Sequence, residues 1–183
     1  MASLTIHPTP FKDLVIIEPK VYADDRGTFF EAWNRETFIQ AGLDTDFVQD
    51  NQSVSAKHVL RGLHFQVPPH EQGKLVRVLK GSVLDVVVDL RKKEPTYGQH
   101  YKMVLSSDDT KMLFIPPGFA HGFLTLEEGS IFFYKCTAVY HPPSDRSIRW
   151  NDPQLGIDWG VGNPILSDKD RHAPLLKDFV NPF

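Results

Sequence analysis

Short apolar or alternating segments, each closed by glycine or proline, make up most of this chain of 183 residues. Its 14 prolines and 12 glycines are spread along the whole sequence. Both residue types interrupt helices and central strands, so long helices are excluded over most of the chain. Short strands separated by frequent turn residues are typical of an all-β sandwich or barrel.

The content of β-branched and aromatic residues predicts ten strands in this chain. We place them at residues 14–18, 28–33, 47–54, 58–66, 74–79, 82–90, 99–105, 111–115, 121–126 and 131–140. One short helix is predicted over 34–41, begun by Asn34 and ended by Gly42. Because so many short strands must protect their edges, we expect a double-sheet jelly roll that dimerisation can extend.

The last 33 residues, 151–183, differ in character from the rest. Prolines and glycines there forbid long strands, yet Ile157, Trp159 and Leu166 need burial. We therefore expect this tail to pack back on the sandwich, over a pocket. No shift of composition marks a second domain, so residues 1–183 are expected to form a single domain.

Charge and targeting signals narrow the function classes. The net charge of −3 and the pI of about 6.2 give no global basic field for nucleic acid. The single cysteine, Cys136, excludes an internal disulfide framework and fits a reducing compartment. Neither a secretory signal nor an apolar run of membrane-spanning length is visible, so a cytoplasmic protein without a membrane partner is expected.

An arginine and a histidine lie inside a predicted strand, Val59-Leu-Arg-Gly-Leu-His-Phe-Gln66. Strict alternation would put Arg61 and His64 on opposite faces of that strand. Both can line one pocket only if the strand bulges, and Gly62 is the residue for such a bulge. The alternative is that His64 is a structural histidine bonded to a neighbour.

Two further side chains could do chemistry in the same pocket. Lys74 opens the next predicted strand, where it is either a solvated strand end or a lysine that stabilises an oxyanion or binds phosphate. Tyr134 shares an apolar face with Phe132 and Cys136. It is either a core tyrosine with a bonded hydroxyl or a general acid in a dry pocket.

His121 follows the pattern Pro-x-Gly-x-x-His, which resembles the second half of the cupin signature, where that histidine can bind metal. The first half of that signature normally supplies His-x-His and a later glutamate. Here those places read His64-Phe65-Gln66 and Glu71. Glutamine is a poor transition-metal ligand, so we expect metal-free use of the pocket.

The tail carries a carboxylate, Asp170, that would matter only if it reached His64. A carboxylate behind an imidazole fixes its tautomer and raises its basicity. In isolation the segment 166–170 instead reads as a solvated helix cap.

Together these stretches resemble the dTDP-4-dehydrorhamnose 3,5-epimerase family, also called dTDP-4-keto-6-deoxyglucose 3,5-epimerase. The resemblance spans most of the chain, in the family's order. Its segments are 25–31, 49–51, 60–66, 72–78, 115–123, 134–135 and 166–170.

The resemblance implies a cupin-like jelly roll, a homodimer, and catalysis without metal or organic cofactor. It implies a thymidine-diphosphate 4-keto-6-deoxyhexose as substrate, inverted at C3 and C5 on the way to rhamnose. His64 would be the base oriented by Asp170, Tyr134 the acid, and Lys74 the group that stabilises the enolate oxygen at C4. The implied substrate contacts are Arg26, Phe29, Glu31, Gln49, Asn51, Arg61, His121, Tyr140, Asp145 and Lys169.

Some of these positions carry finer expectations from the resemblance. Arg26 would contact a phosphate, either in the site of its own subunit or across the dimer in the site of the partner subunit. Tyr140 would stack on thymine. Asp145 stands where the family often has glutamate, and His58 stands where glycine is common.

Three rival functions are open, and the sequence does not separate the first of them, a mono-epimerase, from the double epimerase. An epimerase that inverts only C3 or only C5 would use the same base and acid. A metal-dependent cupin enzyme would hold stoichiometric metal. A non-catalytic sugar-nucleotide-binding jelly roll would not require Tyr134 opposite a His64–Asp170 pair, and fold analogy alone does not decide between them.

Overall fold

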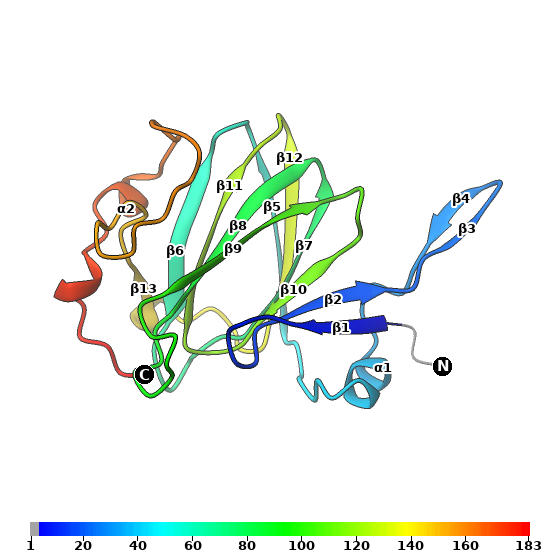
Figure 1. Ribbon diagram of the computed structural model, residues 1–183, viewed down its shortest axis with the longest axis horizontal. Helices are drawn as coiled ribbons and strands as arrows, with labels where there is room; N and C mark the ends of the chain where they lie inside the picture. Colours follow the sequence, from blue (N-terminus) through cyan, green and yellow to red (C-terminus); the bar gives the residue numbers. More distant parts are fainter. Residues whose placement is uncertain (1–3) are drawn as a thin grey trace.

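The computed structural model describes residues 4–183, and these form two facing antiparallel sheets with little helix (Figure 1). The six-stranded sheet has the order β1-β2-β10-β7-β12-β5 and the five-stranded sheet the order β13-β6-β11-β8-β9. The predicted all-β, cupin-like jelly roll is confirmed. The six-stranded sheet comprises β1 (Leu4–Pro8), β2 (Val15–Pro19), β5 (Gln49–Ser55), β7 (Lys74–Lys80), β10 (Met112–Ile115) and β12 (Ser130–Cys136).

The other elements complete the sandwich and its attachments. The five-stranded sheet comprises β6 (Leu60–Gln66), β8 (Ser82–Asp89), β9 (His100–Ser106), β11 (Phe119–Thr125) and β13 (Asp145–Ser147). A separate hairpin and the helices are β3 (Tyr22–Asp24), β4 (Gly27–Phe29), α1 (Arg35–Gln40), α2 (Asp168–Arg171) and the 3₁₀ turns Pro142–Ser144 and Leu176–Asp178. Among residues 4–183, no helix combines the length and apolarity needed to cross a membrane.

All ten predicted strands overlap observed ones, but two were predicted too long. The segment 28–33 is strand only to Phe29, and the segment 131–140 ends at Cys136. Beyond Phe29 the chain has left the hairpin that paired it, and beyond Cys136 it turns toward the cavity mouth. β1, β3 and β13 were not predicted, because they are only three to five residues long and carry no long apolar run.

The space between the two sheets is apolar at one end only. There Val76 and Phe132 of the six-stranded sheet pack against Val87 and Phe123 of the five-stranded sheet. Phe123 and Phe132 stack with ring centroids 4.0 Å apart. This core holds the sheets apart at fixed spacing, so that polar side chains can face each other at the other end.

Each sheet is also covered on its outer face. Helix α1 buries Phe38 against Ile17 and Met112 of the six-stranded sheet. Asn34 accepts hydrogen bonds from the amides of Glu36 and Thr37, so the predicted N-cap is confirmed.

Residues 151–183 lie along the outer face of the five-stranded sheet, beside β6 (Figure 1). Trp159 and Leu176 pack there against Leu63 and Phe65. The tail also pairs with the start of β6, since the amide of Leu60 donates to the carbonyl of Ile165 at 2.9 Å.

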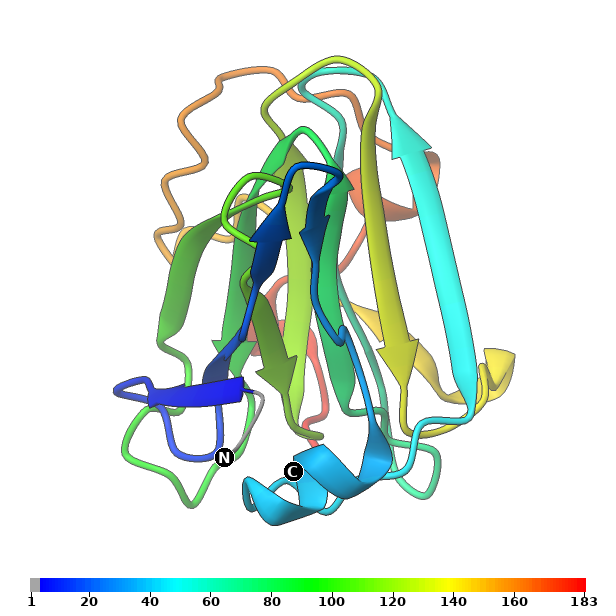
Figure 2. The same ribbon diagram turned by 90° about the vertical axis from the view of Figure 1, so that its right-hand side faces the viewer.

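The β3–β4 hairpin projects away from both sheets (Figure 1), and in Figure 2 it points toward the viewer. All six of its strand residues are exposed. Phe29 leaves 70% of its surface open, which is unusual for a phenylalanine. We call residues 22–29 the arm.

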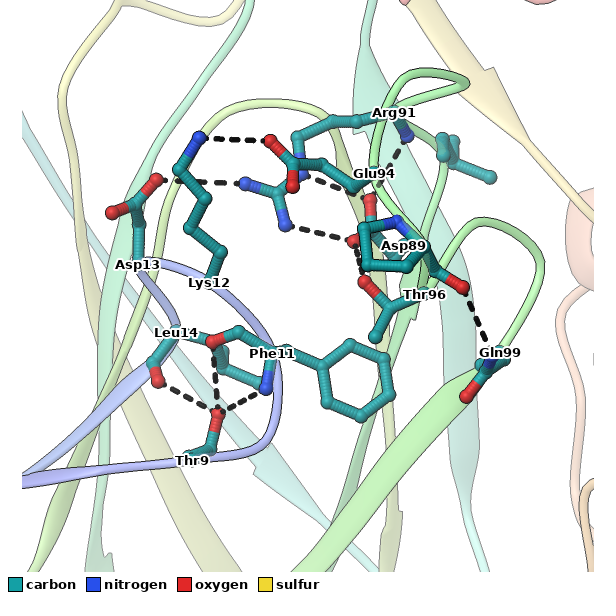
Figure 3. Close-up of polar contacts among 12 residues, drawn as sticks. Thr9, Phe11, Lys12, Asp13, Leu14, Asp89, Arg91, Glu94, Thr96 and Gln99 are labelled. Carbon is teal, nitrogen blue, oxygen red and sulfur yellow. Dashed lines mark hydrogen bonds and ion pairs between the residues drawn. The ribbon is translucent and has the colours of Figure 1, made fainter.

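A polar cluster fastens the turn before β2 to the loop after β8 (Figure 3). Asp89 is buried and accepts two hydrogen bonds from the Arg91 guanidinium and one from the Thr96 hydroxyl. Lys12, on the neighbouring turn, donates to Glu94 at 3.0 Å.

Candidate active site

A cavity of about 710 Å³ opens between the two sheets, beyond the apolar core. One wall is built by β5, β7 and β12, and the other by β6, β11 and β13, with the tail closing one side. It brings together most of the predicted site residues, namely Gln49, Asn51, Arg61, His64, Lys74, His121, Tyr134, Tyr140, Asp145, Lys169 and Asp170.

The predicted bulge in β6 is present and explains how Arg61 and His64 reach the same cavity. His121 pairs with His64 and Phe123 pairs with Arg61, so two steps along β11 match three along β6. Gly62 lies at this step with φ of +145°, a conformation that side-chain-bearing residues rarely adopt. The extra residue changes the alternation between Arg61 and His64.

His64 is backed by the tail carboxylate. Its Nε2 donates to Oδ1 of Asp170 at 2.5 Å, although 106 residues separate the two in sequence. Helix α2 presents Asp170, with Ser167 as its N-cap. Burial alone would raise the pKa of Asp170, but the His64 hydrogen bond and charge, with contacts from Ser167 and the Gly62 amide, bring that pKa below its usual value. The remaining nitrogen of His64, Nδ1, is left for a ligand.

Lys74 lies on the opposite wall at the start of β7 and is buried, not solvated. Its Nζ donates weakly to the carbonyl of His64 at 3.4 Å. Burial lowers the pKa of Lys74, while the nearby Cys136, Asp145 and Asp85 oppose that shift. Within residues 4–183 the bond to His64 is the one hydrogen bond of the ammonium, and a buried ammonium held so weakly is suited to an anionic oxygen.

Tyr134 reaches the cavity from β12, in the sheet that faces His64. Its ring packs at the edge of the inter-sheet core, 5.9 Å from Nζ of Lys74. Burial raises the pKa of Tyr134, so its hydroxyl keeps its proton at neutral pH and can donate it. Base and acid candidates thus stand on opposite walls.

A group that the sequence did not single out is Asp85. It lies on β8 and its Oδ2 accepts a hydrogen bond from Nε2 of His121 at 2.9 Å. The sequence does carry a signal for Asp85, because an acidic residue stands on the interior face of an otherwise apolar strand, Val83-Leu-Asp-Val-Val-Val88. His121 is buried, and burial lowers its pKa despite the Asp85 charge.

Polar side chains at the cavity mouth are already bonded to one another. Asp145 accepts hydrogen bonds from the Tyr140 hydroxyl at 3.2 Å and from Lys169. The amide of Tyr140 donates to the side chain of Gln49, which donates in turn to Asn51 at 3.1 Å. Tyr140 itself is largely exposed, so its ring is open to a planar ligand.

Three predicted contact residues lie outside the cavity of their own chain. Arg26 and Phe29 belong to the arm, where the Arg26 guanidinium bonds Asp24. Glu31 follows the arm and accepts hydrogen bonds from Asn34 and Thr37 near α1.

The positions that correspond to metal ligands in the cupin signature are used in other ways. Gln66 hydrogen-bonds the backbone of His70, Val139 and His141. Between residues 4 and 183, no group of three or more His, Cys, Asp or Glu side chains has the arrangement of a metal site. His64 and His121 each have one ring nitrogen on a carboxylate.

Known proteins of one family are similar to this chain over most of its length. A family model described as dTDP-4-dehydrorhamnose 3,5-epimerase matches residues 8–178. The dTDP-4-dehydrorhamnose 3,5-epimerase of Salmonella typhimurium is 52% identical over 170 residues, covering 92% of this chain and 93% of the relative. That of Methanothermobacter thermautotrophicus is 49% identical over 181 residues, covering 97% of each.

Solved structures are similar over the same length. The 3,5-epimerase of Legionella pneumophila, in complex with dTDP-4-keto-L-rhamnose, has a TM-score of 0.90 at 48% identity and covers 95% of this chain and 93% of its own. A 3'-monoepimerase of Streptomyces bikiniensis, in complex with dTDP-quinovose, has a TM-score of 0.87 at 34% identity and covers 93% and 87%.

Proposed function

This chain belongs to the dTDP-4-dehydrorhamnose 3,5-epimerase family, and we propose the roles that its own residues take in that reaction. It is an isomerase that epimerises C3 and C5 of dTDP-4-dehydro-6-deoxy-D-glucose, a step in dTDP-L-rhamnose biosynthesis. The observation that carries the residue roles is the carboxylate-backed His64 on one sheet facing Tyr134 on the other.

His64 removes the ring protons. Asp170 accepts the Nε2 proton of His64, so the Nδ1 lone pair is free to act as the base. The 4-keto group acidifies the hydrogens on both neighbouring carbons, and charge collects on the C4 oxygen as an enolate. Lys74, buried close to His64, stabilises that charge in the transition state more than in the ground state.

Tyr134 returns a proton to the other face of the sugar. Inversion requires that the acid and the base stand on opposite sides of the ring, and the two sheets supply these sides. The raised pKa of Tyr134 keeps its hydroxyl protonated for this step.

The cavity mouth binds the nucleotide and the sugar hydroxyls. Tyr140 offers an exposed ring for stacking on thymine, and Asp145 with Lys169 supplies polar contacts beside it. Gln49, Asn51 and Arg61 face the sugar and phosphates from the two walls.

A homodimer completes the site by way of the arm. Arg26 and Phe29 protrude into solvent from their own chain, and neither lines its own cavity. An exposed phenylalanine beside an arginine suits a second copy of this chain, where Phe29 would find burial and Arg26 a phosphate. The lone buried cysteine is compatible with the reducing cytoplasm.

Proton NMR of dTDP-4-keto-6-deoxyglucose incubated with the enzyme in D₂O tests the proposal. Deuterium at both C3 and C5 is expected, because each centre loses its proton to His64 and regains one from exchangeable groups. Deuterium at neither carbon would overturn the assignment.

A mono-epimerase is the second candidate, since the similar structure from Streptomyces bikiniensis is described as a 3'-monoepimerase. Deuterium at only one carbon in the same experiment would favour it.

A further inference from the structure

In the cavity wall that carries His64, a second histidine also forms a hydrogen bond with a buried carboxylate. Oδ2 of Asp85 accepts a hydrogen bond from Nε2 of His121 at 2.9 Å. The side chain of Asp85 is fully buried on β8, between two valines, Val83 and Val87, that face the inter-sheet core. A third apolar side chain would suit that place better than a carboxylate if only stability mattered.

The hydrogen bonding of Asp85 also points away from a purely structural role. Its second oxygen, Oδ1, is buried and has no partner in the part of the chain that the structure describes. Structural carboxylates in protein interiors are usually held by several donors, because a half-satisfied charge is costly. Asp89, four residues along the same strand, has such a set of donors from Arg91 and Thr96.

The pairing determines which nitrogen of His121 carries the proton. A carboxylate can only accept, so Nε2 must donate and is protonated. The groups that face His121 are Asp85, Lys74 and His64. Burial lowers the pKa of His121, with a smaller effect from Lys74, against the pull of Asp85. His121 is therefore neutral at neutral pH, with a lone pair on Nδ1.

That lone pair is available to a ligand. His121 lines the cavity, and Nδ1 has no hydrogen-bond partner within residues 4–183. The neighbouring side chains Lys74 and Arg61 can only donate. A sugar hydroxyl needs an acceptor as well as donors, and a neutral His121 supplies one.

We propose that Asp85 is a positioning residue, which fixes His121 as the Nε2–H tautomer so that Nδ1 accepts a hydrogen bond from a hydroxyl of the sugar. The inference rests on the proposed function, because the sugar in the cavity is its ligand. His121 is the direct cross-strand partner of His64. The bond would therefore hold the ring next to the base.

The first test needs no substrate. Nitrogen NMR of ¹⁵N-histidine-labelled enzyme reports which imidazole nitrogens carry protons, and the His121 signals are identified by their absence in His121→Gln. In the wild-type enzyme Nε2 of His121 is expected to be protonated and Nδ1 bare. A protonated Nδ1 in the neutral ring would overturn the proposal.

The second test reverses the polarity of the contact. Asp85→Asn keeps the shape of the side chain but lets its amide donate to Nε2, which moves the proton of His121 to Nδ1. Nδ1 would then donate, so the proton of the sugar hydroxyl would lose its acceptor, and kcat/KM is expected to fall about 10- to 100-fold, mainly through KM. A reversed tautomer with unchanged kcat/KM would refute the sugar contact.

Asp89→Asn is the matched control, since it makes the same change at a buried carboxylate of the same strand outside the cavity. It is expected to leave the His121 tautomer and KM unchanged even if the protein becomes less stable. Wild-type deuterium exchange at C3 and C5 separates the two hypotheses. If exchange fails, the proposed function fails, whereas the tautomer of the substrate-free enzyme still tests the role of Asp85.

Discussion

Gly62 of β6 and Gly122 of β11 lie against each other where the two strands pair around the bulge. A Cβ atom on Gly62 would lie 2.5 Å from Cα of Gly122, and one on Gly122 would lie 2.8 Å from the carbonyl oxygen of Arg61. Neither position has room for a side chain. The bulge that brings Arg61 and His64 to one cavity therefore depends on two glycines from different strands.

Substitution Gly62→Ala is expected to lower the free energy of unfolding by about 2–5 kcal/mol, because it adds backbone strain at positive φ to a clash with backbone atoms. Urea denaturation measures the change. Gly162→Ala is the control, since no atom lies within 4 Å of a Cβ there and its φ is ordinary. Equal stability of the two variants would show that the bulge can relax.

Substitution Asp170→Asn is expected to reduce kcat by about 10²–10⁴-fold, because the amide can hold His64 in the wrong tautomer. Binding of dTDP, measured by calorimetry, should be unchanged, since Asp170 faces His64 and not the mouth. Asp168→Asn on the same helix is the control, with a side chain that is 96% exposed. Loss of dTDP affinity in folded Asp170→Asn would contradict a purely catalytic role.

Substitution Tyr134→Phe should separate proton removal from inversion. His64 still exchanges the C3 and C5 hydrogens with D₂O, whereas the acid on the opposite wall is gone. NMR is therefore expected to show deuterium incorporation with retained configuration. Tyr101→Phe, at the edge of the inter-sheet core, should behave as wild type. Undiminished inversion by Tyr134→Phe would mean that another group delivers the proton.

The Asp89–Arg91 pair predicts a pH-dependent stability (Figure 3). Burial raises the pKa of Asp89, but its bonds to Arg91 and Thr96 outweigh burial and bring that pKa below the ordinary value of 3.8. A carboxylate with a depressed folded-state pKa stabilises the protein fully above 3.8, and the contribution is lost as pH falls through the folded value.

Unfolding of wild type and Asp89→Asn at several pH values measures this contribution. The stability difference is expected to be constant near neutral pH and to shrink below pH 3.8. Asp44→Asn, at an exposed position, should show a difference within about 0.5 kcal/mol throughout. A gap for Asp89→Asn that stayed constant through acid pH would mean that the charge of Asp89 is not what stabilises the loop.

Mixing two inactive variants tests whether the arm acts on the partner. Arg26→Ala has an intact cavity and His64→Ala an intact arm, so a mixed dimer holds one complete site. After subunit exchange of an equal mixture, activity should return to about one quarter of wild type, since half the dimers are mixed and half their sites are complete. No recovery would assign Arg26 to its own chain, and an unimpaired Arg26→Ala would remove it from the site.

Much of the fold could be predicted from the sequence because the strands have strong local signals. Alternating or continuous apolar runs mark β7, β8 and β12, and Asn34 marks the start of α1. The glycine in β6 even predicted the bulge. The missed strands β3 and β13 are only three residues long, so their pairing rather than their composition defines them.

The site was harder to predict, because its contacts join distant parts of the chain. Asp170 reaches His64 only because the tail packs on the outer face of the five-stranded sheet. Asp85 was missed because its role depends on a contact between two strands: Asp85 lies on β8 and hydrogen-bonds His121 on β11. His58 has φ of +65°, a left-handed conformation that glycine adopts more readily than histidine, which fits the expectation of glycine at this position.

The position of Asp170 also fixes when during synthesis the enzyme can become active. Every strand of both sheets lies before residue 148, so a growing chain has all the pieces of the sandwich before α2 exists. The ribosome adds Asp170 later, and only then can His64 gain its partner. A nascent chain that folds as it emerges would thus hold a cavity that is open on the side of the tail, with an unassisted base, until residues 151–183 dock.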